Sequence, residues 1–191
     1  MKYEYGKIDR LSESLGKNNV PKQIYLAIMK DGELIKRTSK NKEKSKWLFG
    51  AINTMDKLLD PYLKKRIRED CACCLSGKRQ KLCKNVNKEY STIEERIEAI
   101  NKTHYVFGNG VKIIGKGKYE VTFFNEDLPI KKCVCVKDLE GKMSITYCFC
   151  CGGHVKHHLQ TVLGVPLEVK TISSALSSEG KKNCRFQLSE I

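Results

Sequence analysis

Apolar residues recur at helical spacing through the first half of the chain. Between positions 47 and 59 they return every three or four residues, which places them on one face of a helix. Asp60 and Pro61 follow, and this pair is typical of a helix start, because aspartate caps free backbone N–H groups and proline fits the first turn. We therefore predict one helix over 47–59 and a second that runs from Pro61 into the cysteines at 71–74.

A third helix is predicted over 91–101. Ile93 and Ile97 belong to its apolar face, and Thr92 and Glu95 have the spacing of a capping box. In that motif each of the two side chains accepts a hydrogen bond from the backbone N–H of the other residue. The helical period ends shortly after this segment.

The second half of the chain changes to the alternating pattern of strands. The stretch 111–124 has a Gly-Lys-Gly turn between two alternating runs, and 131–150 is predicted to be a second hairpin. The stretch 153–164 has a helical pattern that ends at a glycine. Two closing strands are predicted within 165–174 and 183–191.

This order of elements predicts an α+β fold in which N-terminal helices pack on a C-terminal antiparallel sheet with one late helix. Residues 1–45 form a basic segment without a defined pattern, and 38–46 within it have the composition of a solvated linker. Residues 46–191 are expected to form a single cysteine-rich domain.

Nine of the ten cysteines lie in three clusters. A single cysteine can be a small buried apolar residue, but this clustering favours a metal-binding or redox role. The apolar residues of the predicted 131–150 hairpin require the core face, so its cysteines fall together on the other face. A helix ending at 71–74 presents two thiols on one side, because residues three apart share a helix face. The predicted metal ligands are Cys71, Cys74, Cys133, Cys135, Cys148 and Cys150.

Four further side chains are candidates for the same site: Cys73, Cys83, Cys151 and His154. His154, His157 and His158 follow one another on the late helix, where they either bind metal or form a solvated face. Zinc is the predicted ion, and an iron–sulfur cluster is the alternative, because thiolate-rich sites suit both. Cys184 alternates with apolar residues and is predicted to belong to the core.

The formal net charge of +14 raises the question of a nucleic-acid partner. The positive charges concentrate in 36–46 and 77–88, which contain few aromatic residues for base stacking and no nucleic-acid-binding motif. We therefore expect a solvated lysine-rich surface that binds nucleic acid weakly and non-specifically at most.

The N-terminus lacks the apolar segment of a signal peptide, and no apolar run reaches the roughly 18 residues of a membrane span. These features predict a cytoplasmic protein without membrane contact, in a compartment where thiols stay reduced. They leave the oligomeric state open.

The stretch "YCFCCGGHVKHHLQTVLGVPLEVKTISSALSSEGKKNCRFQL" resembles the end of the 4-vinyl reductase-like domain. It is also similar to an uncharacterised cysteine-rich bacterial family near the L-2-amino-thiazoline-4-carboxylic acid hydrolase-like proteins. The resemblance covers about the last sixty residues and, loosely, "CACC". It implies an α+β fold of that type and a small-molecule or metal-binding role, and it matches Cys148, Cys150 and Cys184 by position.

These observations predict a metal-binding sensor or small-molecule-binding domain. One alternative is a hydrolase of a small amide or thiazoline that uses cysteine or metal-activated water. Another is a basic nucleic-acid-binding protein. Whether the chain is an enzyme stays open, because no G-x-S-x-G, Walker A, G-x-G-x-x-G or H-E-x-x-H motif is present.

Overall fold

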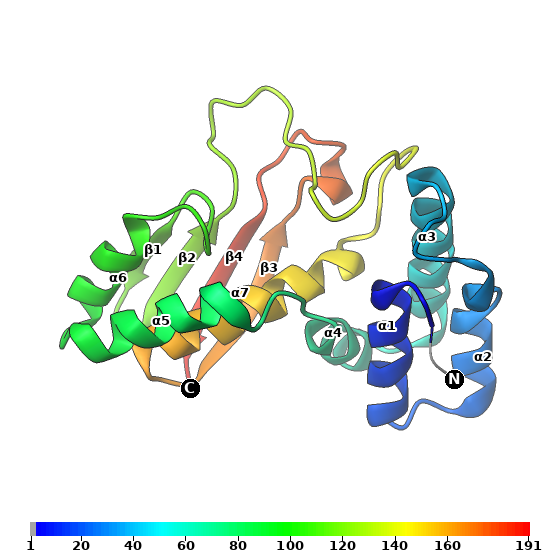
Figure 1. Ribbon diagram of the computed structural model, residues 1–191, viewed down its shortest axis with the longest axis horizontal. Helices are drawn as coiled ribbons and strands as arrows, with labels where there is room; N and C mark the ends of the chain where they lie inside the picture. The colour runs from blue at the N-terminus through cyan, green and yellow to red at the C-terminus, as the bar shows by residue number, and fades with distance from the viewer. Residues whose placement is uncertain (1–2) are drawn as a thin grey trace.

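In the computed structural model, which describes residues 3–191, a mostly helical half lies beside a half built on a sheet (Figure 1). Four helices form the N-terminal half, with a short 3-10 turn at Gly32–Leu34. They are α1 (Gly6–Lys17), α2 (Lys22–Met29), α3 (Asn41–Leu58) and α4 (Pro61–Asp70). The predicted α+β class, with N-terminal helices, an antiparallel sheet and one late helix, is confirmed.

The other half has a four-stranded antiparallel sheet in the order β1-β2-β4-β3, covered on one face by three helices (Figure 1). Its strands are β1 (Val111–Gly115), β2 (Lys118–Thr122), β3 (Leu167–Ser173) and β4 (Arg185–Glu190). The helices are α5 (Gly77–Glu89), α6 (Ile93–Asn101) and α7 (Phe149–Leu163). Short 3-10 turns lie at Ile145–Cys148 and Leu176–Ser178.

Local sequence signals set several of these boundaries as predicted. The Asp60 carboxylate accepts hydrogen bonds from the backbone N–H groups of Tyr62 and Leu63 at the start of α4. Thr92 and Glu95 form the capping box of α6. The hairpin expected over 111–124 is present as β1 and β2, and the two closing strands are β3 and β4.

Each half has its own hydrophobic core. The first lies between the sheet and α5, α6 and α7, and it contains Phe107, Tyr119 and Phe186. The second lies among α1 to α4 and extends to Met143 and Tyr147, just before α7. Helix α7 packs against the sheet along its length and against α4 near its beginning, so the two cores meet there.

Two predictions for the N-terminal segment differ from the structure. Residues up to 45 contain α1 and α2, and α3 begins at Asn41, so the linker predicted over 38–46 is wrong from residue 41 onward. The physical reason is that Ser45 and Leu48 are buried, which extends the apolar face of α3 back toward its start. The division into domains at residue 45 stays a prediction.

The hairpin predicted over 131–150 is wrong. Residues 131–144 form an irregular loop without ladder partners, and 145–151 pass through a 3-10 turn into α7. The residues at 148, 152, 155, 159 and 162 are all buried, and their spacing of four and three residues continues one helix face. The segment therefore follows the helical period and not the alternating pattern of a strand, because a helix buries these residues as one continuous apolar stripe.

Gly153 explains how α4 and α7 approach each other so closely. A Cβ atom at this position would overlap the carbonyl oxygen of Glu69, in the last turn of α4. Only glycine allows this backbone contact. The end of α4 and the first turn of α7 are therefore adjacent, and so are the cysteines that follow one and begin the other.

Candidate thiol centre

Cysteines from three segments that are far apart in the sequence meet where the two cores join. We call this group the thiol centre. It contains Cys73 and Cys74 from the loop after α4, Cys133 and Cys135 from the loop before α7, and Cys150 and Cys151 from the first turn of α7.

The thiols of the centre contact one another in a connected series. Cys135 interacts with Cys133, Cys151 and Cys73. Cys151 also interacts with Cys150, and Cys73 with Cys74. The sulfur of Cys133 accepts the backbone N–H of Cys135 at 3.4 Å. Six thiols thus form one network, and Cys135 has the most thiol partners within it.

Two histidines of α7, the half-buried His154 and the fully buried His158, hold the loop that carries Cys73 and Cys74. The Nδ1–H of His154 donates to the carbonyl oxygen of Cys73, and the Nε2–H of His158 donates to that of Cys74, each at 3.0 Å. Burial lowers the pKa of His158 to about 4, so its ring is neutral at pH 7. Its Nδ1 faces the thiol of Cys83 at 3.6 Å. Both rings therefore position cysteine backbone, and their nitrogens are engaged in doing so.

Three cationic side chains face the same centre. Lys7, Arg10 and Arg68 line a small cavity together with Cys71, Cys73, Cys135, Cys150 and Tyr147, and no carboxylate is among the lining side chains. Arg68 is only 3% exposed, and its Nη2 donates to the carbonyl oxygen of Tyr147 at 3.0 Å. Among residues 3–191, the buried Nε atoms of Arg10 and Arg68 have no hydrogen-bond partner. The cavity thus has positive charge, which thiolates of its lining cysteines would balance.

The cations and the thiol contacts separate the acidities of two neighbouring cysteines. The pKa of Cys150 is lowered by the hydrogen bond from Cys151, and further by Arg68 and Lys7, against the opposing effect of burial. The pKa of Cys151 is raised, because its thiol is hydrogen-bonded to Cys135 and Cys150. Without a metal ion, Cys150 is therefore the thiolate of this pair and Cys151 the donor.

Four of the six predicted metal ligands lie in the thiol centre, and two lie outside it. Cys133, Cys135 and Cys150 lie in the thiol centre, and so does Cys74, although α4 ends at Asp70 and the expected shared helix face of 71–74 is wrong. Cys71 is buried beside the centre, with its sulfur 3.7 Å from the Arg10 carbonyl oxygen. Cys148 is buried at the end of its 3-10 turn, where its thiol interacts with Ser174.

Of the four further candidate ligands, two lie in the thiol centre and two lie outside it. Cys73 and Cys151 belong to the thiol centre, whereas the ring nitrogens of His154 face the carbonyl oxygens of Cys73 and Val106. Cys83 and Cys184 lie in the core beneath the sheet, as predicted for Cys184. Within residues 3–191, no group of three or more histidine, cysteine, aspartate or glutamate side chains is placed so that it could hold a metal ion. Ligand status stays a prediction for every one of these residues.

Neither the three cations nor Gly153 was predicted from the sequence. Lys7 and Arg10 share one face of α1 at a spacing of three residues, and this pattern is common on solvated helices. Arg68 follows the buried Ile67 in α4. The sequence does not show that Arg68 is buried as well, because this depends on how the helix packs against its neighbours. Gly152-Gly153 within a helical pattern was the one local signal of a close approach.

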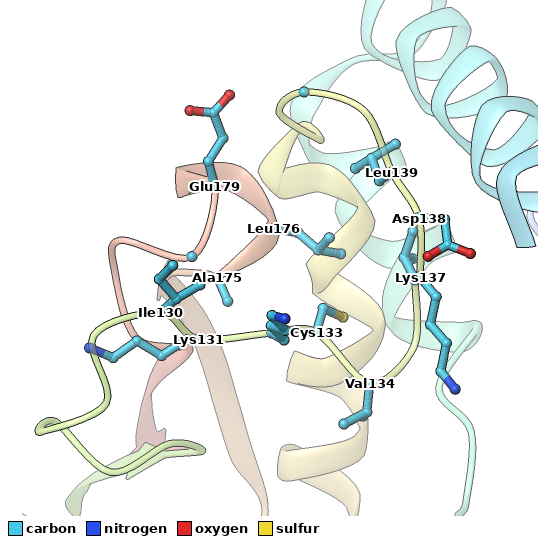
Figure 2. Close-up of a pocket in the computed structure, with 14 residues that line it drawn as sticks. Ile130, Lys131, Cys133, Val134, Lys137, Asp138, Leu139, Ala175, Leu176 and Glu179 are labelled. Carbon is cyan, nitrogen blue, oxygen red and sulfur yellow. The ribbon is translucent and has the colours of Figure 1, made fainter.

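A cleft of about 690 Å³ opens beside the thiol centre, between the loop 130–141 and the loop 175–180. Its walls are largely apolar, and Val134 on its rim is 80% exposed. Figure 2 shows the Cys133 side chain at the inner side of this cleft, with the carboxylates of Asp138 and Glu179 turned away from it. Cys133 therefore belongs both to the cleft and to the thiol centre.

Neither the models of known protein families nor the curated proteins include a match to this chain. Across the part of the chain that the structure describes, none of the helices combines the length and the apolar character needed to cross a membrane.

Proposed function

We propose that the chain binds metal through the thiol centre, with zinc as the first candidate and an iron–sulfur cluster as the second. The observation that carries this proposal is the pairing of clustered thiols with Lys7, Arg10 and Arg68 around a cavity without carboxylates. Soft thiolate ligands favour zinc and iron–sulfur clusters over magnesium or calcium.

The charge of the site supports a metal-bound state. Adjacent thiolates repel each other, so in the absence of metal a pair such as Cys150 and Cys151 shares a proton. A divalent ion between the sulfurs removes this repulsion and allows each thiol to ionise. Four thiolates around one zinc ion carry two net negative charges, which the neighbouring cations Arg10 and Arg68 can balance.

Metal binding would require some of the thiols to move. Zinc needs sulfurs roughly 4 Å apart around a common point, at Zn–S distances of about 2.3 Å. The thiols of the centre instead contact one another pairwise. Rotation about the Cα–Cβ bonds of Cys73 and Cys135, both half-buried, would turn their sulfurs toward a shared ion.

Elemental analysis of protein purified anaerobically without added metal tests this proposal. We expect stoichiometric zinc, or iron with visible absorption, and a large loss of metal in Cys150→Ser. Cys184→Ser is the matched control, because this cysteine lies in the sheet core, and it should keep the full metal content. Protein that stays metal-free after incubation with zinc and iron salts, or that contains paired disulfides instead, would refute the proposal.

A second candidate function, binding of a small molecule, is favoured by the cleft beside Cys133. Its volume of about 690 Å³ lies within the usual range of ligand sites, about 300–1,000 Å³, and its walls are mostly apolar. Labelling of Cys133 by N-phenylmaleimide, an apolar thiol reagent, tests access to this cleft. Labelling should be slower in Val134→Asp, which places a charge on the rim, and an unchanged rate would argue against the cleft as an apolar site.

A further inference from the structure

The cavity between the three cations is very small. Arg68 from α4, and Lys7 and Arg10 from α1, line a space of about 20 Å³. A cavity needs roughly 10–15 Å³ to hold one water molecule, so this one accepts a single group of about that size. Over residues 3–191, its lining includes no aspartate or glutamate. The cavity therefore combines several positive charges with room for one small occupant.

Arg68 is fixed in place by Tyr147. Its Nη2 donates to the Tyr147 carbonyl oxygen at 3.0 Å, and its guanidinium carbon lies 4.8 Å from the centre of the Tyr147 ring. The buried Nε–H has no hydrogen-bond partner in the part of the chain that the structure describes. A buried donor without an acceptor is costly, and more so when it is charged. A ligand that accepts this hydrogen bond is therefore favoured.

Arg10 supplies a second donor of the same kind from the neighbouring helix. Its buried Nε likewise has no partner within residues 3–191. The thiol of Cys71 donates to the carbonyl oxygen of Arg10, at 3.7 Å, and so keeps its proton. The ammonium group of Lys7 is already engaged, because it donates to the carbonyl oxygen of Cys135. Two guanidinium N–H groups at one cavity thus remain without an acceptor.

We propose that this cavity binds a small monovalent anion of the halide class, for which chloride is the probe. The ion would accept hydrogen bonds from the Nε–H groups of Arg10 and Arg68. Phosphate, sulfate and carboxylate ligands are larger than one water molecule and do not fit this volume. The inference goes beyond the proposed metal-binding function, because it depends on the arginines and not on the thiols.

A thiolate in the lining does not remove the need for an anion. One thiolate offsets one of the three cations, which leaves two positive charges around the cavity. Buried charge without a counter-charge is strongly unfavourable. A bound halide reduces the remaining charge to that of one cation and satisfies both arginine donors at once.

Thermal unfolding of the full-length, reduced and metal-free protein at pH 7 tests the anion site. Sodium chloride replaces sodium gluconate at constant ionic strength, because gluconate is too large for the cavity. We expect the Tm to rise with chloride and to level off, by about 4 °C in total for a Kd of about 10 mM. The chloride-35 NMR line should broaden with the protein present and narrow again when bromide displaces the bound chloride.

Two variants separate this cavity from the basic surface. Arg10→Gln removes one donor and leaves the contacts between Arg68 and Tyr147 in place, so it should weaken chloride binding at least tenfold. Arg66→Gln is the matched control, because it removes the same charge from an exposed position of α4, and it should bind chloride as wild type does.

Equal Tm values in chloride and gluconate, or the same chloride dependence in Arg10→Gln and Arg66→Gln, would overturn the anion site. No metal is present in these experiments, so either result leaves the proposed metal-binding function to be decided by elemental analysis alone.

Discussion

The cysteines in the sheet core and those in the thiol centre have different surroundings. Cys184 is buried among apolar side chains, and its sulfur accepts one hydrogen bond, from the backbone N–H of Ala175 at 3.3 Å. Cys83 is buried in the same core, with His158 as its polar neighbour. Cys135, in contrast, contacts three other thiols and lies in a cavity lined by cations.

This comparison shows why burial and count alone do not identify a functional cysteine. Isolated buried thiols behave as small apolar side chains, and they need no charge nearby. Cys150 lies beside Arg68 and Lys7, which stabilise its thiolate. Thiols that gather with buried cations indicate a site where sulfur carries charge, and the sheet core contains no such arrangement around Cys184.

The largest loss of stability is expected from Gly153→Ala, which disrupts the contact between α4 and α7 beside the thiol centre. The new Cβ would overlap the Glu69 carbonyl oxygen, so α4 and α7 must separate. Overpacking of this kind costs typically 1–3 kcal/mol, and we expect about 3 kcal/mol, because the clash is with backbone. Denaturant unfolding should show this loss, together with faster alkylation of Cys73 and Cys151.

Gly50→Ala in α3 is the matched control for that variant. A Cβ at Gly50 has no heavy atom within 4 Å, so alanine should raise stability by about 0.5–1 kcal/mol through its helix propensity. Equal effects of the two substitutions would mean that the close contact at Gly153 does not hold the junction.

The next largest effect is the loss of stability at low pH that comes from His158, whose ring holds the loop carrying Cys73 and Cys74. Its pKa in the folded state is about 4, below the ordinary value of 6.5, so the unfolded chain takes up a proton that the folded protein does not. The contribution of the neutral His158 ring to the free energy of unfolding is therefore fully present above pH 6.5 and is lost as the pH drops toward 4. The linkage predicts a loss of about 2 kcal/mol at pH 5 from this group.

Denaturant unfolding of wild type and His158→Gln between pH 7.5 and pH 5 measures this contribution. The glutamine can still donate to the Cys74 carbonyl oxygen but does not titrate. The variant should lose less stability than wild type over this range. The same pH dependence in both proteins would show that His158 is not held neutral by its burial.

The smallest effect is expected for Cys184→Ser in the sheet core. Serine is more polar than cysteine and keeps one acceptor for the Ala175 N–H, so we expect a loss of about 1 kcal/mol. Metal content and the alkylation rates of the thiol centre should not change. A loss of metal in this variant would remove the distinction between the two groups of cysteines.

The sequence patterns predicted the parts of the fold that local periodicity determines. The β1–β2 hairpin, α6 with its capping box and the closing strands follow from spacing and turn residues within each segment. The segment 131–150 was mistaken for a hairpin, because cysteines and apolar residues alternate there over a short distance. The buried stripe from Cys148 to Val162 shows that the helical period extended over more residues.

The thiol centre was only partly predictable, because it depends on contacts between distant segments. The C-x-C and C-A-C-C spacings indicated which cysteines to consider. Lys7 reaches the carbonyl oxygen of Cys135 across 128 positions of the chain, and no local pattern contains that information. The approach of α4 to α7 at Gly153 is likewise set by the packing of the two cores.

The most direct test of a shared metal centre is residue-resolved alkylation of the native, reduced protein with and without zinc. Mass spectrometry of the labelled peptides should show that zinc protects Cys73, Cys74, Cys133, Cys135, Cys150 and Cys151 together, while labelling of Cys83 and Cys184 stays unchanged. The exposed thiol of Cys74 is the most informative, because only a ligand can shield it. Rapid labelling of Cys74 at saturating zinc, or protection confined to one of the three segments, would contradict a single centre.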